Sequence, residues 1–395
     1  MRLLWLTEHY PPSRGGMAES CDRIVRGLRE AGVEIDVAHL TRRDRPWQTG
    51  GERGGRLLTV PLEDNPEHAL RRLWTVLRGE SYTHVVAFGG TYAMLGAPIL
   101  AAWLGAPLVT LLRGNDFDTG VFSLRRRGAL LDALRASATV CVVASGHAPL
   151  VSALVPEARV RWVANGIDTA GWQILPSERA AGLARRAAAG RRTIGLIGQL
   201  KNKKGVGFLL DALAASGHAD LFHLLLVGEL EADLTVPAGH TRLPFLDRYE
   251  LPALYAACDL VALPSFYDGL PNVALEAAAL GVPLLASDAG GLADLVDDEI
   301  GFRFAAGDPH ECRAAVDRAA RATDEQLAKL GTAAAERVRR DFTVTAETEG
   351  YLRVFRESAR SAAPPDDSEL STPPNRTGLS APPDGTGLSA PPNRT

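Results

Sequence analysis

The chain alternates short apolar runs with longer stretches of helical period, and this alternation constrains its fold more than any other feature. Residues 20–32 illustrate the helical stretches, because Ile24, Val25 and Leu28 share one face and Gly32 suits a helix C-terminus. In the N-terminal half, the apolar runs are residues 2–6, 34–40, 56–60, 84–88, 107–112, 139–144 and 160–164. Such alternation predicts βα units and a parallel sheet.

The same alternation starts again near residue 193, after a stretch rich in Ala, Arg and Gly. The second series of apolar runs comprises residues 193–198, 222–228, 260–264, 283–287 and 301–304. The helical stretches between them comprise residues 205–216, 249–257, 272–280 and 290–297. A strand, a glycine-containing loop and a helix that recur in this order predict a second Rossmann-like domain. Two domains also fit the length of 395 residues, because one core rarely grows to that size.

We therefore predict an α/β protein with two Rossmann-like, doubly wound domains. The predicted divisions are an N-terminal domain over residues 1–172, a linker over 173–190, a C-terminal domain over 191–344, a helix over 345–360 and a tail over 361–395. We expect the helix to pack back on the N-terminal domain. The tail is an imperfect nine-residue repeat rich in Pro, Gly, Ser and Thr. We predict that it is disordered, because it buries too little apolar area to offset its chain entropy.

Charge, cysteine spacing and hydrophobicity exclude several classes of protein. The formal net charge of −4 gives no electrostatic reason to expect a nucleic-acid partner. The four cysteines form no Cys-x-x-Cys pair, so neither a disulfide framework nor a zinc site is expected. No stretch approaches the roughly 20 apolar residues of a membrane span, and the N-terminus lacks a secretory signal. We expect a cytoplasmic protein, and its preference for Arg over Lys is typical of a GC-rich bacterial genome.

The loop after the first predicted strand contains two adjacent glycines, Gly15 and Gly16, immediately before a predicted helix. Without a Cβ, these residues allow main-chain amides to approach an anion at the helix N-terminus. Glycine pairs also serve plain tight turns. This loop alone therefore leaves a binding role and a turn equally open.

The loop that opens the second series contains three of the four lysines of the chain, Lys201, Lys203 and Lys204. It follows a strand that ends at Gly198, and Gly205 opens the next helix. Cations beside the amides of a helix start are suited to binding a diphosphate. A solvated basic loop is the usual explanation for such a run, but the scarcity of lysine elsewhere favours the binding role.

A third loop contains Asp268, and Glu276 lies in the first turns of the otherwise apolar helix that follows. A carboxylate near a helix start is stabilised by the helix dipole, and it can accept hydrogen bonds from two ribose hydroxyls. Asp268 lies eight residues earlier and can reach a sugar beyond the diphosphate. The alternative is that Asp268 caps the turn and Glu276 pairs with an arginine.

Together these motifs resemble glycosyltransferase family 4, a large group of retaining enzymes with the GT-B fold. In that family a carboxylate, seven residues and a glutamate precede an Ala-rich helix and a Gly-x-Pro turn, and here Asp268 and Glu276 precede Gly281, Val282 and Pro283. Further segments match in family order: residues 15–19, 109–116, 142–150, 163–169, 198–205, 224–229 and 251–265. The resemblance implies two domains that face a cleft, with a nucleotide-sugar donor bound by the second.

The resemblance also implies a role for each matching residue. Lys204 would neutralise the donor diphosphate as the glycosidic bond breaks, and Asp268 would bind the transferred sugar together with backbone amides of its loop. Arg113 lies where many members have a cleft-facing histidine. The implied catalytic residues are Lys204, Asp268 and Arg113, and the implied donor-binding residues are Gly15, Gly16, Gln199, Gly269, Leu270, Asn272, Val273 and Glu276. His9 and Asp116 are candidate residues on the acceptor side.

The chain departs from the family pattern at three points. Gln199 replaces the usual arginine of the phosphate loop and removes one fixed charge, for which a neighbouring lysine can compensate. Asp268 replaces the commoner glutamate and shortens its reach by one methylene. After Gly228, Glu229 and Leu230 replace a second glycine and a proline, which alters the environment expected for the base.

The resemblance implies transfer with retention and without a metal ion or other cofactor. The sequence offers no good protein nucleophile, so we favour a front-face mechanism in which the leaving phosphate deprotonates the acceptor. Preorganised cations and amides would stabilise the charge on the departing nucleoside diphosphate. We expect a nucleoside-diphosphate sugar as donor, and a biosynthetic small molecule or an envelope glycan or lipid as acceptor.

Other functions remain open at this point. Gln199 and Asp268 fit a catalytically silent, nucleotide-sugar-binding partner subunit, and a GT-B sugar epimerase would need acid and base residues that the sequence does not reveal. An NAD-dependent dehydrogenase is disfavoured, because no Gly-x-Gly-x-x-Gly follows the first strand. The Arg-rich residues 71–78 and 123–135 fit contact with an anionic membrane, but solvated helix faces explain them better.

Overall fold

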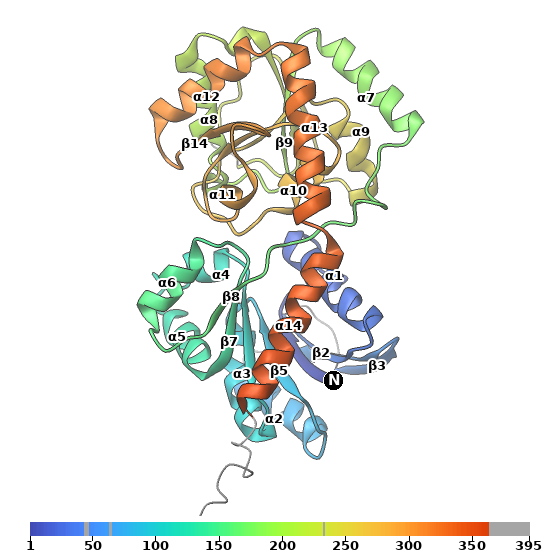
Figure 1. Cartoon of the computed structure of the whole chain (residues 1–395), viewed down its shortest axis with the longest axis vertical. Helices are drawn as coiled ribbons and strands as arrows, with labels where there is room; N and C mark the ends of the chain where they lie inside the picture. The colour runs from blue at the N-terminus through green and yellow to red at the C-terminus, as the bar shows by residue number, and fades with distance from the viewer. Residues whose placement is uncertain (43–46, 63–64, 232–233, 363–395) are drawn as a thin grey trace, which may run out of the picture. The chain divides into compact units, whose positions relative to one another are not determined.

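A computed structural model of the chain describes residues 1–42, 47–62, 65–231 and 234–362. It contains two sheets, one built by each half of the chain (Figure 1). Residues 361 and 362, which were predicted to begin the tail, end a helix. From residue 363 onward the repeat tail lies outside the described residues, so its disorder stays a prediction.

The first sheet has eight strands in the order β3-β4-β2-β1-β5-β6-β7-β8. Its strands are β1 (Arg2–Thr7), β2 (Glu34–Thr41), β3 (Gln48–Glu52), β4 (Gly55–Pro61), β5 (His84–Phe88), β6 (Leu108–Leu112), β7 (Ser137–Val142) and β8 (Val160–Trp162). All neighbours are parallel except β3 and β4. The carboxyl ends of the parallel strands therefore meet at one edge, where loops can converge on a ligand.

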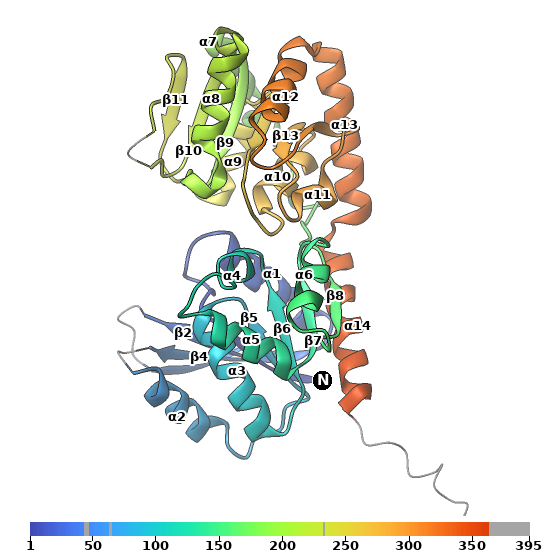
Figure 2. The same cartoon turned by 90° about the vertical axis from the view of Figure 1, so that its left-hand side faces the viewer.

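Helices cover both faces of this sheet, and the side chains of β1 show why. The helices are α1 (Gly16–Glu30), α2 (Pro66–Leu77), α3 (Thr91–Leu104), α4 (Asn115–Asp118), α5 (Arg127–Ala136), α6 (His147–Leu154) and α14 (Val344–Ala362). Successive strand residues point to opposite faces. Leu3 and Trp5 pack with residues of α1 and α14, whereas Leu4 and Leu6 pack with residues of α2 and α3. Figure 2 shows α3 and α5 in front of the sheet.

The second sheet has six strands in the order β11-β10-β9-β12-β13-β14, and all neighbours are parallel. Its strands are β9 (Arg192–Ile197), β10 (Phe222–Val227), β11 (His240–Leu243), β12 (Leu260–Leu263), β13 (Leu284–Ser287) and β14 (Gly301–Phe304). Its helices are α7 (Pro176–Ala189), α8 (Val206–Ser216), α9 (Leu251–Tyr255), α10 (Asn272–Ala279), α11 (Leu292–Leu295), α12 (Pro309–Arg321) and α13 (Asp324–Asp341), with 3₁₀ turns at Asn202–Lys204, Ala219–Leu221 and Arg248–Glu250. Two doubly wound sheets are thus confirmed.

The chain crosses from one sheet to the other twice, and the two connecting segments run side by side. Ile167 and Thr343 form a parallel bridge, and the Ile167 amide donates to the Phe342 carbonyl over 2.9 Å. After the second passage, α14 returns to the first sheet, where it contacts α1 and β7. Tyr351 and Phe355 of α14 are fully buried there.

The segment expected as a linker over residues 173–190 contains the helix α7. Pro176 occupies its first turn, and the Leu175 amide donates to the Glu178 carboxylate over 2.7 Å. Gly190 ends the helix in the left-handed conformation with a φ of 61°. The residue of α7 that is buried is Gly182. The helix therefore lacks the apolar stripe by which a core-facing helix is recognised in a sequence, and it was not predicted.

Two edge strands were not predicted. Strand β3 consists of largely exposed polar and glycine residues, and β11 has a half-exposed surface with two charged or ionisable side chains. Neither shows the apolar alternation on which strand prediction depends. Both lie at the outer edge of their sheets, where pairing on one side is enough to hold a strand.

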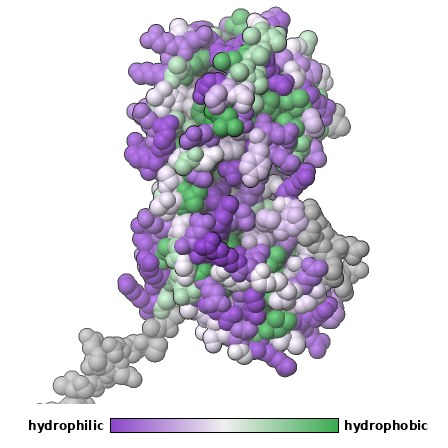
Figure 3. Space-filling view, turned by 90° about the vertical axis from the view of Figure 1, so that its right-hand side faces the viewer, coloured by the Kyte–Doolittle hydropathy of each residue, from purple (hydrophilic) through white to green (hydrophobic). Residues whose placement is uncertain are grey.

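Among the described residues, every helix is too short or too polar to cross a lipid bilayer. On the face shown in Figure 3, hydrophilic residues predominate and apolar residues form small separate groups.

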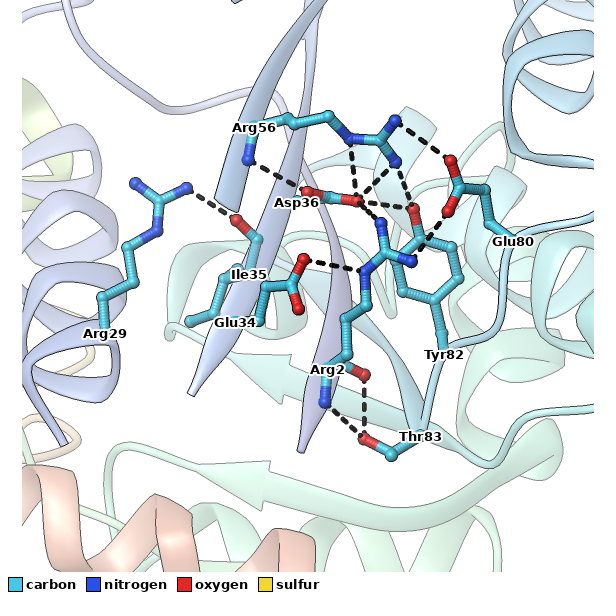
Figure 4. Close-up of polar contacts among 9 residues, drawn as sticks. All are labelled: Arg2, Arg29, Glu34, Ile35, Asp36, Arg56, Glu80, Tyr82 and Thr83. Atoms are coloured by element: carbon cyan, nitrogen blue, oxygen red, sulfur yellow. Dashed lines mark hydrogen bonds and ion pairs between the residues drawn. The ribbon is translucent and has the colours of Figure 1, made fainter. Parts of the chain in front are cut away.

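Asp36 is the centre of a polar cluster at the amino end of the first sheet (Figure 4). The carboxylate is fully buried and accepts hydrogen bonds from Arg2 (2.8 Å), from Arg56 (2.6 Å) and from the Tyr82 hydroxyl (2.7 Å). Burial alone would raise the pKa of Asp36, but the hydrogen bonds from Arg56 and Tyr82 and the neighbouring charges hold it below its ordinary value. The cluster lies at the edge opposite the carboxyl ends of the strands, so it serves stability.

We expect Asp36→Ala to lower the free energy of unfolding by about 2 kcal/mol at neutral pH, because its buried partners lose their acceptor. In the native protein this contribution is present above the ordinary pKa of 3.8 and is lost as the pH falls through the lower pKa of the folded state. Urea unfolding at neutral pH and at about pH 3 measures both effects. Glu34→Ala is the control, since that exposed partner of Arg2 should change stability by less than about 1 kcal/mol. Equal losses in the two variants would contradict the interpretation.

Candidate functional site

A cavity of about 650 Å³ lies where loops of both sheets converge. Its walls are formed by strands β9, β10 and β12, by the first turns of α1, α8 and α10, and by loops that include the one after β1. The sequence-predicted residues that line it are His9, Gly15, Gly16, Arg113, Gln199, Lys204, Asp268, Leu270, Asn272, Val273 and Glu276. Of the residues predicted for the site, Gly269 and Asp116 are not among those that line the cavity, although the structure describes both.

The loop that contains Lys201, Lys203 and Lys204 (the lysine loop) lies close against the end of β12, and a glycine makes this approach possible. Gly205 has a φ of 65°, and a Cβ added there would lie 1.9 Å from the Pro264 carbonyl oxygen. The loop therefore needs glycine both for its conformation and for its close approach. The 3₁₀ turn before Gly205 directs Lys203 and Lys204 to the cavity that they line.

Lys204 forms an ion pair with Asp268 inside the cavity. The two residues come from different loops, 64 positions apart in the chain. The Asp268 carboxylate also accepts the amide of Gly269 over 3.0 Å and the Ser265 hydroxyl over 3.4 Å. The lysine loop and the loop that contains Asp268 (the carboxylate loop) thus meet at one point, as a shared ligand would require.

Lys203 is a second cation in the cavity, and its hydrogen bond goes to a neutral group. Its ammonium donates to Asn115 Oδ1 over 3.1 Å and lies 5.8 Å from the centre of the Tyr267 ring. Burial lowers the pKa of Lys203. Because Gln199 is neutral, Lys203 is the neighbouring lysine placed to supply a second positive charge beside Lys204.

Glu276 is buried in α10, and its position combines the two interpretations offered by the sequence. Its carboxylate lines the cavity and accepts the Tyr255 hydroxyl over 2.8 Å, while Arg248 Nε lies 3.9 Å from the second oxygen. The Trp172 indole donates to the backbone carbonyl of Glu276 over 3.0 Å. The carboxylate is thus oriented by Tyr255 and weakly paired with Arg248, and its second oxygen stays available to a ligand hydroxyl.

Burial raises the pKa of Glu276, and the Tyr255 hydrogen bond opposes that shift in part. We expect donor affinity to fall as the pH is lowered towards this raised pKa, because a protonated carboxyl is a poorer acceptor. The stability contribution has the opposite sign. The folded state holds this proton more tightly than the unfolded chain, so stability rises as the pH falls from the raised pKa towards the ordinary value of 4.5.

We expect Glu276→Gln to weaken donor binding about tenfold at neutral pH and to remove this pH dependence, because a charge-assisted hydrogen bond becomes a neutral one. Titration calorimetry over a pH series measures both changes. Tyr255→Phe is the matched variant, since loss of its hydroxyl should move the affinity midpoint to higher pH. An unchanged pH profile in Glu276→Gln would refute the assignment of Glu276.

The backbones of the two halves touch at a pair of glycines beside the cavity. A Cβ added to Gly114 would lie 2.3 Å from the amide nitrogen of Gly269, and one added to Gly269 would lie 2.3 Å from the carbonyl oxygen of Arg113. Gly269 therefore contributes backbone contact here, which explains why it is absent from the cavity wall. The amide of Gly291 also donates to the Gly269 carbonyl over 2.7 Å.

Arg113 is buried, and its guanidinium is fixed by neutral partners. It donates to the Tyr351 hydroxyl over 2.8 Å and to the side-chain oxygen of Asn165, and it lies 5.0 Å from the Phe88 ring centre. Asn165 in turn donates to the Leu270 carbonyl over 2.6 Å. Asn165 thus links the guanidinium of Arg113 to the backbone of the carboxylate loop.

The acceptor-side residues differ in position. Asp116 accepts the amide of Arg113 over 2.9 Å and that of Phe117 over 3.0 Å, so its carboxylate stabilises its own loop. His9 lines the cavity, and burial lowers its pKa, which favours the neutral imidazole. Between these two candidates, the geometry favours His9 for contact with a ligand.

The glycine loop of the first half approaches the carboxylate loop of the second. Gly15 has a φ of 113°, and Gly16 opens α1. The Asn272 side chain donates to the Gly16 carbonyl over 3.3 Å and accepts the Ser20 hydroxyl over 3.3 Å. Asn272 therefore contacts the backbone of this loop as well as the cavity.

Sequence reasoning missed three residues of the site. Asn165 belongs to a segment that the resemblance included, but nothing in the sequence showed its two-sided hydrogen bonding. Arg248 and Tyr255 lie 28 and 21 positions before Glu276 and become its neighbours only through the fold. Among the described residues, no group of three or more His, Cys, Asp or Glu is arranged to hold a metal ion.

Two family models match the chain. The model described as Glycosyltransferase Family 4 matches residues 14–170, and the model described as Glycosyl transferases group 1 matches residues 191–321. Together the two matched segments cover more than half of the chain and include both sides of the cavity.

Similar solved structures are known. A sucrose-phosphate synthase from Thermosynechococcus elongatus has a TM-score of 0.76 at 18% identity, with 91% of this chain and 99% of that chain covered. HepE from Anabaena, in complex with UDP-glucose, has a TM-score of 0.72 at 19% identity, with coverage of 90% and 100%. The catalytic domain of Starch Synthase IV from Arabidopsis thaliana, bound to ADP and acarbose, has a TM-score of 0.68 at 16% identity, with coverage of 91% and 99%. At these identities the likeness shows a shared fold.

Proposed function

Because the chain belongs to glycosyltransferase family 4 and has the GT-B fold predicted for it, it is a glycosyltransferase, and we propose that it transfers a sugar from a nucleoside-diphosphate donor with retention of configuration. The observation on which this proposal rests is the meeting of Lys204, Lys203, Asp268 and Glu276 in one cavity. The two lysines suit the binding of a diphosphate. The two carboxylates suit hydrogen bonds from hydroxyl groups, Glu276 from those of the ribose and Asp268 from those of the transferred sugar. HepE, which has the same fold, is a precedent for a bound UDP-sugar.

In the proposed reaction, the bond between the anomeric carbon and the diphosphate oxygen breaks, and a bond to the acceptor oxygen forms on the same face. Negative charge grows on the departing phosphate, where the Lys204 ammonium would stabilise it. The acceptor hydroxyl gives its proton to a phosphate oxygen of the leaving group. Lys203 and Lys204 would neutralise that group, so the proposed step uses no metal ion. Closure of the cavity around the donor would limit hydrolysis by water.

Asp268 has a dual position that fits this sequence of events. Its carboxylate pairs with Lys204. A bound diphosphate would compete for the ammonium and release an Asp268 oxygen for the hydroxyls of the sugar. The pair compensates both charges in a partly buried site, which lowers the cost of their burial.

The experiment that tests the proposal is a thermal-shift screen of UDP-, GDP- and dTDP-sugars, followed by donor turnover. We expect donors with one of the three bases to raise the melting temperature of the protein. In the absence of an acceptor, we expect the protein to hydrolyse that donor slowly. The released sugar should keep its anomeric configuration, as measured by NMR. A silent partner subunit would bind a donor without turnover, and an epimerase would isomerise the free donor. Either result would overturn the proposed transfer.

A further inference from the structure

The outer surface of the first half contains an apolar helix between two arginine-bearing segments. Helix α3 contacts α2 on one side and α5 on the other, and α3 and α5 lie side by side on the face turned to the viewer in Figure 2. Helix α3 has no charged residue at all. Its exposed large side chains are Leu95 (40%), Ile99 (36%) and Trp103 (48%), spaced so that they form one outward stripe.

Two further apolar side chains protrude from the loop before α5. Phe122 is 87% exposed and Leu124 is 101% exposed, so almost the whole of each side chain meets solvent. Both precede Arg125, Arg126 and Arg127 directly. Side chains that protrude this far cannot fill a pocket of their own fold, and they are suited to insertion into another phase.

Arginines flank the apolar stripe on both sides. Residues 66–78 and 121–135 together contain seven arginines and two acidic residues, which gives them a net charge of +5 in a chain whose net charge is −4. Arg71, Arg72 and Arg78 are exposed on and beside α2, and Arg125, Arg127 and Arg135 are exposed on and beside α5. By contrast, the face shown in Figure 3 has only small separate apolar groups.

We propose that this surface, formed by α2, α3, α5 and the loop over residues 119–126, docks on an anionic phospholipid bilayer. Arginines flanking apolar and tryptophan side chains match an anionic headgroup layer over an acyl interior. A second copy of the chain fits less well, because two surfaces of net charge +5 repel each other. Protruding side chains also need no preformed pockets in a fluid bilayer, whereas a protein partner would have to provide them.

The surface begins next to the cavity. The amide of Tyr92, in the first turn of α3, donates to Glu8, which precedes the cavity residue His9. The added Cβ of Gly89 would lie 3.4 Å from the Arg113 side chain. A docked bilayer would therefore lie near the acceptor side of the cavity. This part of the inference, which rests on the proposed function, assigns the acceptor to the class of lipid-linked molecules.

The test is co-sedimentation of the full chain with vesicles of phosphatidylcholine alone and with vesicles that also contain phosphatidylglycerol. We expect binding to the anionic vesicles only, and weakening with added salt. Replacement of Arg125, Arg126 and Arg127 by Gln should weaken binding on the order of a hundredfold. The double change Phe122→Ser and Leu124→Ser should weaken it by about tenfold or more. The matched control is Leu183→Ser with Leu221→Ser, two exposed leucines of the second half, which should bind like the native chain.

Absence of binding to anionic vesicles, or equal losses in the control, would overturn the docking surface. A change of oligomeric state in the Phe122/Leu124 variant without a change in vesicle binding would instead assign the surface to a second copy and also overturn it. Donor-induced thermal shifts, measured on the same preparations, separate the two proposals. Vesicle binding without any donor shift would contradict the glycosyltransferase mechanism, and a donor shift without vesicle binding would contradict the docking surface alone.

Discussion

Replacement of Lys204 by alanine should lower kcat by about a thousandfold, while donor affinity falls by about tenfold. The difference arises because the ammonium meets more negative charge in the transition state than in the bound donor. As the sugar leaves, the full charge of the nucleoside diphosphate develops beside the lysine loop. Steady-state kinetics with the donor found in the thermal-shift screen, together with direct measurement of donor binding, gives both numbers.

Lys201→Ala is the control for this variant. Lys201 belongs to the same loop, but its side chain is exposed, and it is not among the described residues that line the cavity. We expect its kcat to stay within about twofold of the native value, since an exposed charge outside the cavity wall is screened by solvent. Similar losses in both variants would show that the loop acts through its overall charge. An unchanged kcat in Lys204→Ala would remove Lys204 from the catalytic residues.

Gly269→Ala should lower kcat/KM by a hundredfold or more, although it adds one methyl group outside the cavity wall. The added Cβ would lie 2.3 Å from the Arg113 carbonyl oxygen and 2.9 Å from the Val143 side chain. The carboxylate loop must therefore retreat from the first half, and a displacement of about 1 Å at a reacting centre costs roughly two orders of magnitude in rate. Gly269 is not among the glycines with positive φ, so the effect is steric.

Gly128→Ala provides the comparison. This glycine lies in α5, and nothing within 4 Å would meet its Cβ. Activity should stay unchanged, and the free energy of unfolding should rise by about 0.5–1 kcal/mol, because alanine favours a helix more than glycine does. If Gly269→Ala kept full activity and native stability, the contact with the Arg113 carbonyl would have no part in turnover.

The sequence was sufficient to predict the two sheets, because each buried strand is a short apolar run bounded by turn residues. Strand β1 shows the reason: its residues on both faces are buried, so the run is continuous and unmistakable. The linker helix α7 could not be predicted on the same basis. It packs through the space left by Gly182, whose added Cβ would lie 2.6 Å from Ala256, and a contact made by a missing side chain leaves no apolar signal.

The candidate site could be predicted where chemistry depends on residues close in sequence. Asp268 and Glu276 lie on one loop and the helix that follows it, so their spacing left a shared ligand open, and the family resemblance implied it. The partners of Glu276 could not be found in this way, because Tyr255 and Arg248 reach it from another helix and turn. Asp116 was a candidate because it lies in a segment that resembles the family, but its carboxylate accepts hydrogen bonds from amides of its own loop. The sequence does not show this local role.

The return of α14 to the first sheet makes the N-terminal domain discontinuous in sequence. Its core includes Tyr351, Val354 and Phe355, which follow the whole second domain along the chain. A fragment that ends after β8 would leave the surface of α1 and β7 without this helix and would expose a large apolar area to water. To express the first domain alone, one would therefore have to join residues 344–362 to its end through a new connection. The second domain, in contrast, can be excised as one uninterrupted segment.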